Sequence, residues 1–588
     1  INALLKSDDL LRAGQMLDQL QRLVKPDAVI VQDLALVQLV KQTGFSGEIH
    51  LSTLANAGFS AALQVIRQKL EVDRVVLPRE LNIDEIKQLA AVCPPGLGLE
   101  VFVHGALCYA VSGRCYWSSY MGGKSGLRGR CVQPCRRQYS QSNQKNRYFS
   151  CQDLSVDVLA KVLLSIPQVC TWKIEGRKKG PHYVYYTACA YRMLRDHGQD
   201  AQTKKAALQM LSRALGRPGT HYNFLPQRPQ NPVNLSYQTG SGLLVGRIKG
   251  SGQKPYFIAR EELLTGDVLR LGYEDEAGHS IKRIGRSVPK GGRLDVSFSS
   301  KKAPVKGAPV FLTDRREKAL VDMISDLEKT LGQIPESRNP ASSFKPRLPA
   351  GISKKARVVD LPVYRKPTGS IPRDGVGLWL SGQSVKKIAA KMKSPVWWWL
   401  PPVVWPDNEI EIRSQVEMAI KKGARHFVLN APWQIAFFKK QKGFHLWAGP
   451  FCNLANPLAI AAVKSMGLTG AIVSPELGRE DYLQLPQQSP IPLGVVIAGS
   501  WPLCVARSLA EDVKPYKAFS SPRGEQAWVA KYDSDYWVYP NWKIDLKRHK
   551  KLLERAGYQL FVDLIEPIPQ TVKLKKRQGL WNWDISLK

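Results

Sequence analysis

Five cysteines fall within one polar, glycine-rich stretch of this 588-residue chain. They are Cys108, Cys115, Cys131, Cys135 and Cys151. Cysteines that cluster in a loop commonly bind a metal ion or an iron–sulfur cluster when the surroundings are reducing. The first four are spaced as C-x6-C-x15-C-x3-C, without the C-x2-C pairs that zinc ribbons use. The spacing alone therefore leaves an iron–sulfur cluster, zinc and no metal as alternatives. Interspersed Arg and Lys residues would favour thiolates and offset the charge of a cluster.

Candidate acid–base and anion-binding residues stand close to this loop or after other apolar runs. His104 directly precedes the loop, and a neutral imidazole there could transfer a proton. Glu175 could act as a base or hold an arginine, and Arg177 could bind a carboxylate through two parallel hydrogen bonds. Glu80, next to Arg79, allows the same two roles. The structural alternatives are a hydrogen-bonded histidine and buried Glu–Arg ion pairs.

The elements that must position these residues alternate between apolar strands and amphipathic helices from Ile1 to about residue 196. Strands are predicted at 28–32, 48–52, 74–78, 99–103 and 170–174. Helices are predicted at 16–24, 34–43, 55–69, 83–92, 155–165 and 180–195. This order predicts a parallel β/α sheet, and the first residues, INALLKSDDLLRAG, read as a strand running into a helix. Because active sites of such folds lie at the carboxyl ends of the strands, we expect the cysteine loop, residues 104–151, to lie beside Glu80, His104 and Glu175.

The rest of the chain divides into three parts. Residues 236–330 hold short apolar runs separated by Gly, Lys and Ser, which predicts a small antiparallel β-domain, most simply a barrel, that binds RNA or acts as a spacer. Residues 331–374 include seven prolines from position 333 onward and predict a linker. Residues 375–588 return to β/α alternation.

The last part repeats the first. Leu-Ala-Asn at 54–56 recurs at 454–456, and the 28-residue separation of Glu80 and Cys108 recurs between Glu476 and Cys504. We interpret 375–588 as a degenerate copy of the β/α domain at 1–215. The copy has no residue that matches the other three cysteines, so we expect it to have a structural or RNA-binding role.

The charge indicates a polyanionic partner. Lys and Arg total 85 against 49 Asp and Glu, a net charge of +36. Nucleic acid fits this excess better than an anionic membrane surface, although a general solubility effect is the alternative. Basic stretches that could follow phosphates are Lys421–Lys422, Lys439–Lys442, Lys547–Lys551 and Lys573–Arg577. Trp397 to Trp399 could stack on bases or form core. No apolar run reaches the roughly 18 residues of a membrane-spanning helix, so we expect no membrane partner.

The segments EVFVHGALCYAVSGRC, RGRCVQPCRRQY and WKIEGRKKGPHYV resemble the U32 family, historically called U32 peptidases or collagenase-like proteases. The resemblance covers about residues 1–195 and, weakly, 375–510. It implies a TIM-barrel-like domain whose first strands would precede Ile1. It also implies a [4Fe–4S] cluster on four cysteines, Cys151 being left out because the family tolerates other residues there. The implied ligands are Cys108, Cys115, Cys131 and Cys135.

The resemblance further implies oxygen-independent hydroxylation of a ribosomal RNA cytidine or a tRNA uridine, with prephenate as the hydroxyl donor. His104, Glu175 and Arg177 would then line the donor pocket, with Glu80 as a further candidate, in a cytoplasmic enzyme. Two alternatives stay open. A U32 peptidase could use Cys115 with His104, although the chain has neither HExxH nor GxSxG. A non-catalytic RNA-binding or assembly factor could keep the cluster, or zinc, for structure alone.

Overall fold

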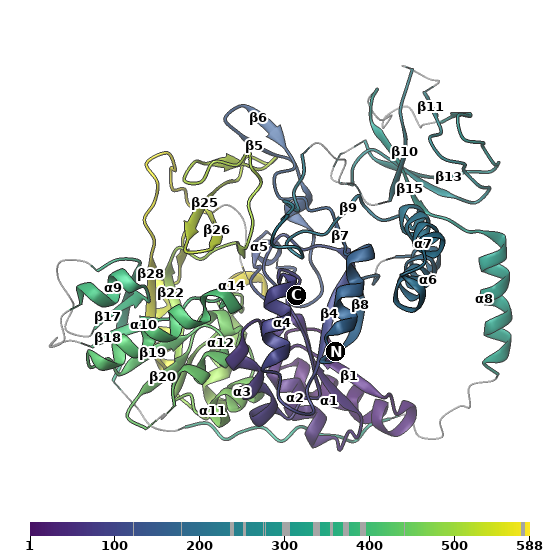
Figure 1. Ribbon diagram of the computed structural model, residues 1–588. Helices are drawn as coiled ribbons and strands as arrows, with labels where there is room; N and C mark the ends of the chain where they lie inside the picture. The colour runs from purple at the N-terminus through teal and green to yellow at the C-terminus, as the bar shows by residue number, and fades with distance from the viewer. Residues whose placement is uncertain are drawn as a thin grey trace.

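Two β/α units, a small antiparallel β-domain and a sheet shared by the two units make up the computed structural model (Figure 1). The structure describes residues 1–588 except 122, 178, 236–239, 241, 251–254, 275, 277, 297–305, 333–340, 353–356, 368–374, 389–394, 440–441, 578–581 and 588. No helix in these described ranges is long and apolar enough to cross a bilayer.

The first unit contains a parallel sheet in the order β1-β2-β3-β4-β8. Its strands are β1 (Ala28–Val31), β2 (Glu48–Leu51), β3 (Arg74–Val76), β4 (Gly98–Ala106) and β8 (Val169–Ile174). Its helices are α1 (Asp9–Gln19), α2 (Leu34–Gln42), α3 (Ser60–Leu70), α4 (Ile83–Ala91), α6 (Pro181–His197) and α7 (Ala201–Arg213). Each predicted strand matches an observed one to within two residues, except that β4 continues three residues further. Residues 1–7 form no strand, and the Ile1 amino group instead donates to the Ile30 carbonyl oxygen.

The second unit is a closed barrel of eight parallel strands, because β22 pairs with both β21 and β28, and β28 pairs with β16. Its strands are β16 (Val359–Tyr364), β17 (Val376–Trp379), β18 (Val396–Trp399), β19 (His426–Leu429), β20 (His445–Ala448), β21 (Gly470–Ile472), β22 (Leu493–Gly499) and β28 (Tyr558–Ile565). Its helices are α9 (Gly382–Lys387), α10 (Glu409–Lys421), α11 (Pro457–Met466), α12 (Arg479–Gln484) and α13 (Lys550–Ala556).

This barrel bears on two expectations. Residues 375–588 were expected to be a copy that lacks three of the loop cysteines, and this half closes into a barrel, whereas the first sheet stays open in the described chain. The expected linker 331–374 also supplies β16, which closes the barrel. Its proline content misled the prediction. Pro362 lies before β16 begins to pair with β17 at Val363, so its missing N–H removes no bond on that side. Much of the rest of that linker lies outside the described residues.

The repeat within the chain is visible in the strand order, since β19-β20-β21-β22-β28 follows the same path as β1-β2-β3-β4-β8. Its register differs from the one we expected. Asn56 ends the short helix η2 (Thr53–Ala55) with φ 55°, and Asn453 ends η7 (Pro450–Cys452) with φ 56°. Asn56 therefore corresponds to Asn453, not to Asn456. Asparagine is one of the few residue types that readily adopt this left-handed conformation.

An antiparallel six-stranded sheet joins the two units, in the order β23-β26-β25-β24-β5-β6. Its strands are β5 (Tyr139–Gln141), β6 (Gln144–Asn146), β23 (Cys504–Ala506), β24 (Phe519–Ser520), β25 (Gln526–Tyr532) and β26 (Asp535–Pro540). The first two belong to the insertion between β4 and β8, and the others to the insertion between β22 and β28. The two insertions therefore build one structure above both sheets (Figure 1).

Buried polar contacts fix the two units against each other. The Glu409 carboxylate accepts hydrogen bonds from the Ser60 and Ala61 amides at 2.7 and 3.1 Å and so caps α3. Asn456 Nδ2 donates to the Asp33 carboxylate at 3.1 Å. The described residues of both units share one continuous hydrophobic core.

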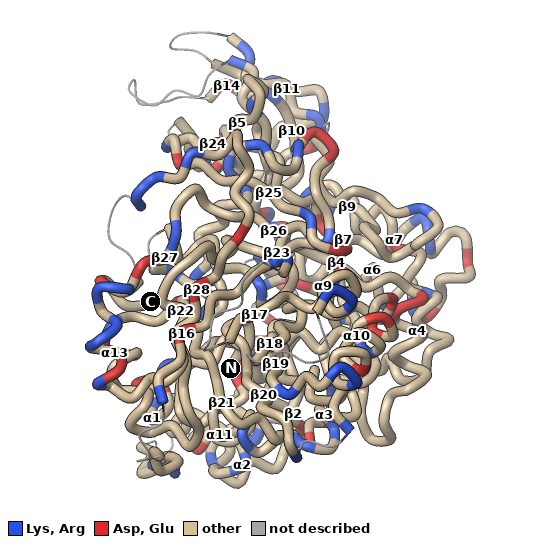
Figure 2. The backbone as a smooth tube through the Cα atoms, turned by 90° about the vertical axis from the view of Figure 1, so that its left-hand side faces the viewer, with Lys and Arg blue, Asp and Glu red and all other residues tan. Residues whose placement is uncertain are grey.

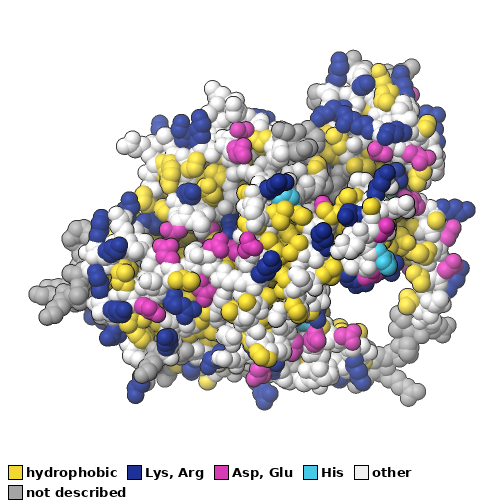
Figure 3. All heavy atoms as spheres, in the orientation of Figure 1, with side chains coloured by type: hydrophobic (Ala, Val, Ile, Leu, Met, Phe, Trp, Pro, Cys, Tyr) yellow, Lys and Arg dark blue, Asp and Glu magenta, His cyan; other side chains and the backbone are white. Residues whose placement is uncertain are grey.

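The small β-domain has its own hydrophobic core and two antiparallel sheets, one of four strands and one of two. Its strands are β10 (Leu243–Arg247), β11 (Tyr256–Ile258), β12 (Val268–Leu271), β13 (Ser280–Arg283), β14 (Arg293–Asp295) and β15 (Pro309–Asp314). Helix α8 (Lys318–Thr330) follows it; its first turns share a cavity with α6 and α7 of the first unit, and the rest of the helix extends away from them (Figure 1). Figure 3 shows Lys and Arg side chains gathered on this domain, at the upper right.

The tryptophan triplet and several basic stretches have structural roles. Trp397, Trp398 and Trp399 form β18 and are buried, so the base-stacking hypothesis is wrong for them. Lys422 Nζ donates to the carbonyl oxygens of Val385, Lys386 and Ile388. Within the other stretches, Lys547, Lys550 and Arg577 are bound to Asp563, Asp360 and the Tyr120 carbonyl oxygen, respectively. Of Lys439–Lys442, residues 440–441 lie outside the described residues.

Candidate functional site

The cysteine loop leaves β4 at its carboxyl end and is held there by both β/α units. Tyr116 N donates to the Leu503 carbonyl oxygen at 2.7 Å, and Val505 N donates to the Arg114 carbonyl oxygen at 3.0 Å. Two asparagine side chains also hold the loop: Asn56 Nδ2 donates to Ser112 O, and Asn453 Nδ2 donates to Gly113 O. The corresponding asparagines of the two units thus hold adjacent carbonyl groups of the same loop.

The fold brings the four predicted ligand cysteines into one neighbourhood, which we call the cysteine centre. Desolvation by the surrounding protein raises the pKa of Cys108, and the neighbouring Cys131 raises it further. Burial also raises the pKa of Cys115, with Cys504, Cys108 and Cys131 as its neighbouring thiols. The pKa of Cys135 is raised by burial, lowered by Arg136, and raised by Cys108 and Cys131. Each thiol therefore interacts electrostatically with others of the set.

The donor chemistry of these cysteines fits an iron–sulfur cluster or zinc, because both are commonly held by four thiolates. Cys108 and Cys131 have exposed side chains, whereas Cys115 and Cys135 are half-buried. Within the described chain, no three His, Cys, Asp or Glu side chains are close enough to hold a metal ion. The loop therefore gathers the four thiols in one place but holds them further apart than metal ligands.

Arg136 fixes the loop beside Cys135. Its Nη2 donates to the Leu107 carbonyl oxygen at 2.9 Å, and its Nη1 donates to Ser150 Oγ at 3.2 Å and to the Cys151 carbonyl oxygen. One guanidinium thus ties the start of the loop, before Cys108, to its end at Cys151.

Glu80 and Arg79 are neighbours of Cys108, because Arg79 lowers the pKa of that thiol and Glu80 raises it. The Glu80 side chain is buried, burial raises its pKa, and its Oε2 has no hydrogen-bond partner among the described residues. Arg79 pairs with Glu175 at 3.4 Å and stacks over the Phe102 ring. Glu175 also accepts a hydrogen bond from the Arg177 amide. The expected Glu–Arg pair is therefore between Glu175 and Arg79, and the Arg177 side chain is exposed.

His104 accepts a backbone hydrogen bond from the Glu175 amide at 2.8 Å, but its side chain faces a different cavity. Burial lowers its pKa to about 4, so the imidazole is neutral at physiological pH, and Nδ1 lies 3.3 Å from the Tyr191 hydroxyl. The side chain lines a cavity of about 690 Å³ together with Asp157, Arg217 and Arg247. None of the four cysteines lines this cavity, nor do Glu80, Glu175 or Arg177. The structure therefore places the predicted histidine in a second pocket, on the side of the small β-domain.

Another cavity, of about 470 Å³, opens at Cys131 and was not predicted. Six arginines line it, and we call it the arginine pocket: Arg136, Arg137, Arg147, Arg217, Arg270 and Arg523. They come from the cysteine loop, the segment before the small β-domain, that domain itself and the turn between β24 and β25. Only the adjacent pair at 136–137 was a sequence signal, because the other four are scattered over more than 370 residues. Figure 2 shows the basic residues near β5, β10 and β24.

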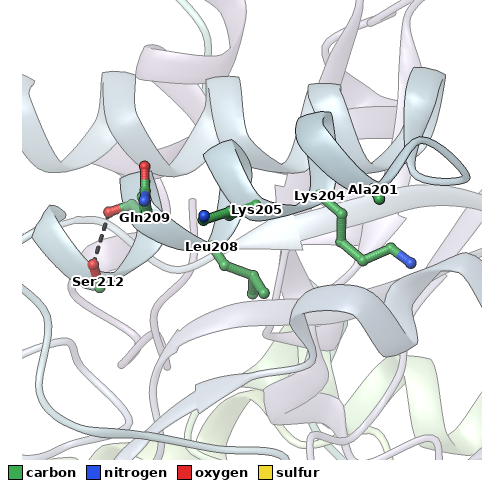
Figure 4. Close-up of a pocket in the computed structure, with 6 residues that line it drawn as sticks. All are labelled: Ala201, Lys204, Lys205, Leu208, Gln209 and Ser212. Atoms are coloured by element: carbon green, nitrogen blue, oxygen red, sulfur yellow. Dashed lines mark hydrogen bonds between the residues drawn. The ribbon is translucent and has the colours of Figure 1, made fainter.

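A further depression, of about 450 Å³, runs along α7 (Figure 4). Its lining residues are Ala201, Lys204, Lys205, Leu208, Gln209 and Ser212. They include no carboxylate, cysteine or histidine, so this depression offers no catalytic or metal-binding group.

Known proteins resemble parts of this chain. Residues 1–234 match the model of Peptidase family U32. The chain is 33% identical over 369 residues to the 23S rRNA 5-hydroxycytidine C2501 synthase of Escherichia coli, covering 61% of this chain and 53% of that protein. It is 43% identical over 116 residues to tRNA hydroxylation protein P of Haemophilus influenzae, covering 20% and 25%. It is 33% identical over 211 residues to a collagenase of Porphyromonas gingivalis, covering 33% and 49%. The chain thus spans about half or less of the length of these relatives.

Proposed function

We propose, from the match of residues 1–234 to the model of Peptidase family U32, that the chain is an iron–sulfur-dependent RNA hydroxylase. It would hydroxylate a pyrimidine base of ribosomal or transfer RNA without molecular oxygen, using a prephenate-like dicarboxylate as hydroxyl donor. The observation that carries the proposal is the gathering of Cys108, Cys115, Cys131 and Cys135 in the cysteine centre, where the arginine pocket opens. The names of two relatives, which describe rRNA and tRNA hydroxylation, support the substrate class.

When bound, an iron–sulfur cluster supplies an electron-transfer or Lewis-acid centre beside the substrate. The protein residues around it have separable roles. Arg79, oriented by Glu175, places positive charge next to Cys108 and so favours its thiolate. Glu80 keeps one buried carboxyl oxygen without a hydrogen-bond partner in the described chain, which leaves it available for a proton of the substrate. Arg177, exposed after β8, would bind a carboxylate of the donor.

The second candidate is a peptidase, which the family name and the collagenase relative favour. A cysteine peptidase would need the Cys115 thiol and the His104 imidazole in contact. Cys115 has a pKa raised by burial, which disfavours the nucleophilic thiolate, and His104 faces a cavity that Cys115 does not line. The contacts of these two residues therefore give the cysteine-peptidase hypothesis no support.

The test is anaerobic purification of the full chain with iron, sulfide and zinc analysis, followed by mass spectrometry of nucleosides from RNA incubated with the protein. We expect about four irons per chain and a hydroxylated pyrimidine. The iron content and the amount of hydroxylated pyrimidine should both fall in each of four variants: Cys108→Ser, Cys115→Ser, Cys131→Ser and Cys135→Ser. The matched control is Cys170→Ser, because Cys170 is exposed on β8 outside the loop.

The outcomes separate the candidates. Iron with a modified nucleoside supports the hydroxylase. Zinc in place of iron makes the cysteines a structural site and contradicts the proposal. A metal-free chain that cleaves denatured collagen identifies a peptidase instead. Full iron content and full modification in all four serine variants would show that these cysteines are not the ligands.

A further inference from the structure

The arginine pocket is the strongest charged feature that the four cysteines do not explain. Its lining contains six arginines and a single acidic side chain, Glu274. Tyr273 and Cys131 lie in the same wall. Four parts of the molecule close it: the cysteine loop, the segment with Arg217 and Gly240 before the small β-domain, that domain at residues 270–274, and Pro522 and Arg523 of the second unit.

Half of the arginine charge is balanced by the protein itself. Arg217 pairs with Asp153 at 3.2 Å, Arg270 pairs with Glu274, and Arg147 lies 3.7 Å from Glu276. The other three are Arg136, Arg137 and Arg523. Among the described residues, no carboxylate lies within ion-pair distance of these three. Three guanidinium groups at one cavity therefore leave a strong positive potential that an anionic ligand would neutralise.

The residue types in the pocket narrow the chemistry of that ligand. Arginine presents a planar set of donors that matches the oxygens of phosphate and carboxylate groups. Tyr273 adds an aromatic ring, and Arg147 covers one of its faces with the guanidinium carbon 3.9 Å from the ring centroid. An aromatic ring and arginines together match a nucleotide, whose base stacks and whose phosphate accepts hydrogen bonds. A small dicarboxylate would use the arginines but has no group for the ring.

The position of the pocket relates it to the cysteine centre. Cys131 belongs to both, so a ligand seated among the arginines touches the edge of the centre. The pocket volume of about 470 Å³ lies within the usual range for small-ligand sites. A single nucleotide of a strand can occupy it while its neighbour reaches the cysteines.

We propose that the arginine pocket binds a phosphate and base of single-stranded RNA next to the nucleotide that is modified, and so positions that nucleotide at the cysteine centre. This inference deepens the proposed hydroxylase function and rests on it. The small β-domain then contributes directly to the site through Arg270 and Tyr273, and it is more than a spacer.

The test uses the full chain and a fluorescein-labelled oligouridylate of about 12 nucleotides, with binding followed by fluorescence anisotropy at several salt concentrations. The variant is Arg137→Gln with Arg523→Gln. The matched control is Arg12→Gln with Arg192→Gln, which removes two exposed arginines from α1 and α6. We expect the affinity of the pocket variant for the oligouridylate to fall by about tenfold or more. The slope of log affinity against log salt concentration should become smaller by about 1.4. The control should stay within about twofold of the unchanged protein.

A second measurement gives a positive signal. Ultraviolet crosslinking of the same oligouridylate should attach RNA to the peptide that contains Tyr273, and Tyr273→Ala should abolish that crosslink. Equal affinities and equal salt slopes of the pocket and control variants, with no crosslink at Tyr273, would overturn the inference. Malonate should displace RNA from the unchanged protein at constant ionic strength. If the pocket variant no longer shows this displacement, oxyanions bind in the arginine pocket. If malonate binds in the pocket but the affinity for RNA is the same in the pocket variant and the unchanged protein, the site belongs to a small dicarboxylate and the inference is wrong.

Failure of the hydroxylase proposal gives a different result. If the protein binds RNA through the pocket but yields no modified nucleoside, the inferred binding site stands and the hydroxylase proposal fails. If the protein modifies RNA equally well with and without Arg137 and Arg523, the hydroxylase proposal stands and the inferred binding site fails. Iron analysis of the pocket variant excludes an indirect effect through loss of the cluster.

Discussion

Cys115 and Cys504 face each other across an antiparallel bridge that joins the cysteine loop to β23 of the second unit. The flanking bonds run from Tyr116 N to Leu503 O and from Val505 N to Arg114 O. This pattern makes the two cysteines a non-hydrogen-bonded pair, the arrangement in which opposite Cα atoms are closest, at about 4.5 Å. The predicted ligand Cys115 therefore lies directly against Cys504, a cysteine from the other half of the chain.

This pairing predicts a specific oxidation product. In metal-free protein, oxidised glutathione should convert the two thiols into a Cys115–Cys504 disulfide, and the oxidant is reduced to two molecules of glutathione. The Cα separation suits a disulfide, although burial raises the pKa of both thiols and will slow the reaction at neutral pH. Peptide mapping under non-reducing conditions should find this crosslink, and Cys504→Ser should remove it. A crosslink between Cys108 and Cys131 in its place would contradict the predicted geometry.

Arg136 should control the order of the loop. Arg136→Gln removes the bonds to Leu107 O, Ser150 Oγ and Cys151 O, and leaves carbonyl groups without donors. We expect a loss of about 1–3 kcal/mol in local stability and lower iron content. Hydrogen exchange of peptides covering residues 107–151 measures this effect. Arg137→Gln is the control, because Arg137 has the same charge but contacts the Met121 sulfur. Equal exchange in both variants would show that Arg136 does not hold the loop.

Glu476 should make the stability of the loop depend on pH. Burial raises its pKa to about 7, and Ser125 of the cysteine loop donates to its carboxyl oxygens. A buried acid with a raised pKa is favourable when protonated, so its contribution is present at low pH and is lost as the pH rises through about 7. Glu476→Gln should therefore raise the unfolding temperature relative to the unchanged protein by about 5 °C at pH 8 and by much less at pH 5.

Differential scanning fluorimetry at both pH values measures this difference. Glu480→Gln, at an exposed position of α12, should show no such pH-dependent difference. Other buried acids, including Asp33 and Asp535, titrate in both the variant and the unchanged protein, so only the difference between the two reports on Glu476. A pH-independent difference would mean that Glu476 stays ionised.

Asn453 should contribute both backbone conformation and hydrogen bonds. It has φ 56°, donates to Gly113 O at 3.0 Å and accepts from the Tyr116 hydroxyl at 2.9 Å. Asn453→Gly keeps the left-handed conformation and loses only the side-chain bonds, whereas Asn453→Ala loses both. We expect the alanine variant to be less stable than the glycine variant by about 1 kcal/mol. Chemical denaturation compares them, and equal stability would assign the whole effect to the hydrogen bonds.

Part of this protein could be predicted from the sequence. The strands and most helices of the first unit were found because apolar runs and helical periodicity are local properties, and helix α1 was the one placed several residues too late. The four cysteines could be assigned to one loop because they are close in sequence, although their closeness to one another in space is a property of the fold. Trp397–Trp399 show the limit of composition, since the same triplet suits a base-binding surface and a buried strand.

The tertiary structure alone decided the rest. The closed barrel depends on β28 pairing with both β22 and β16, and the latter pair is separated by about 200 residues of chain. His104 and Glu80 were expected at one site, but the side chains around them place one in a separate cavity and the other beside Cys108. The arginine pocket unites residues from 136 to 523, and no local pattern marks Arg270 or Arg523 as its members. Local periodicity is encoded by neighbouring residues, whereas barrel closure and the meeting of distant charges depend on how whole units pack.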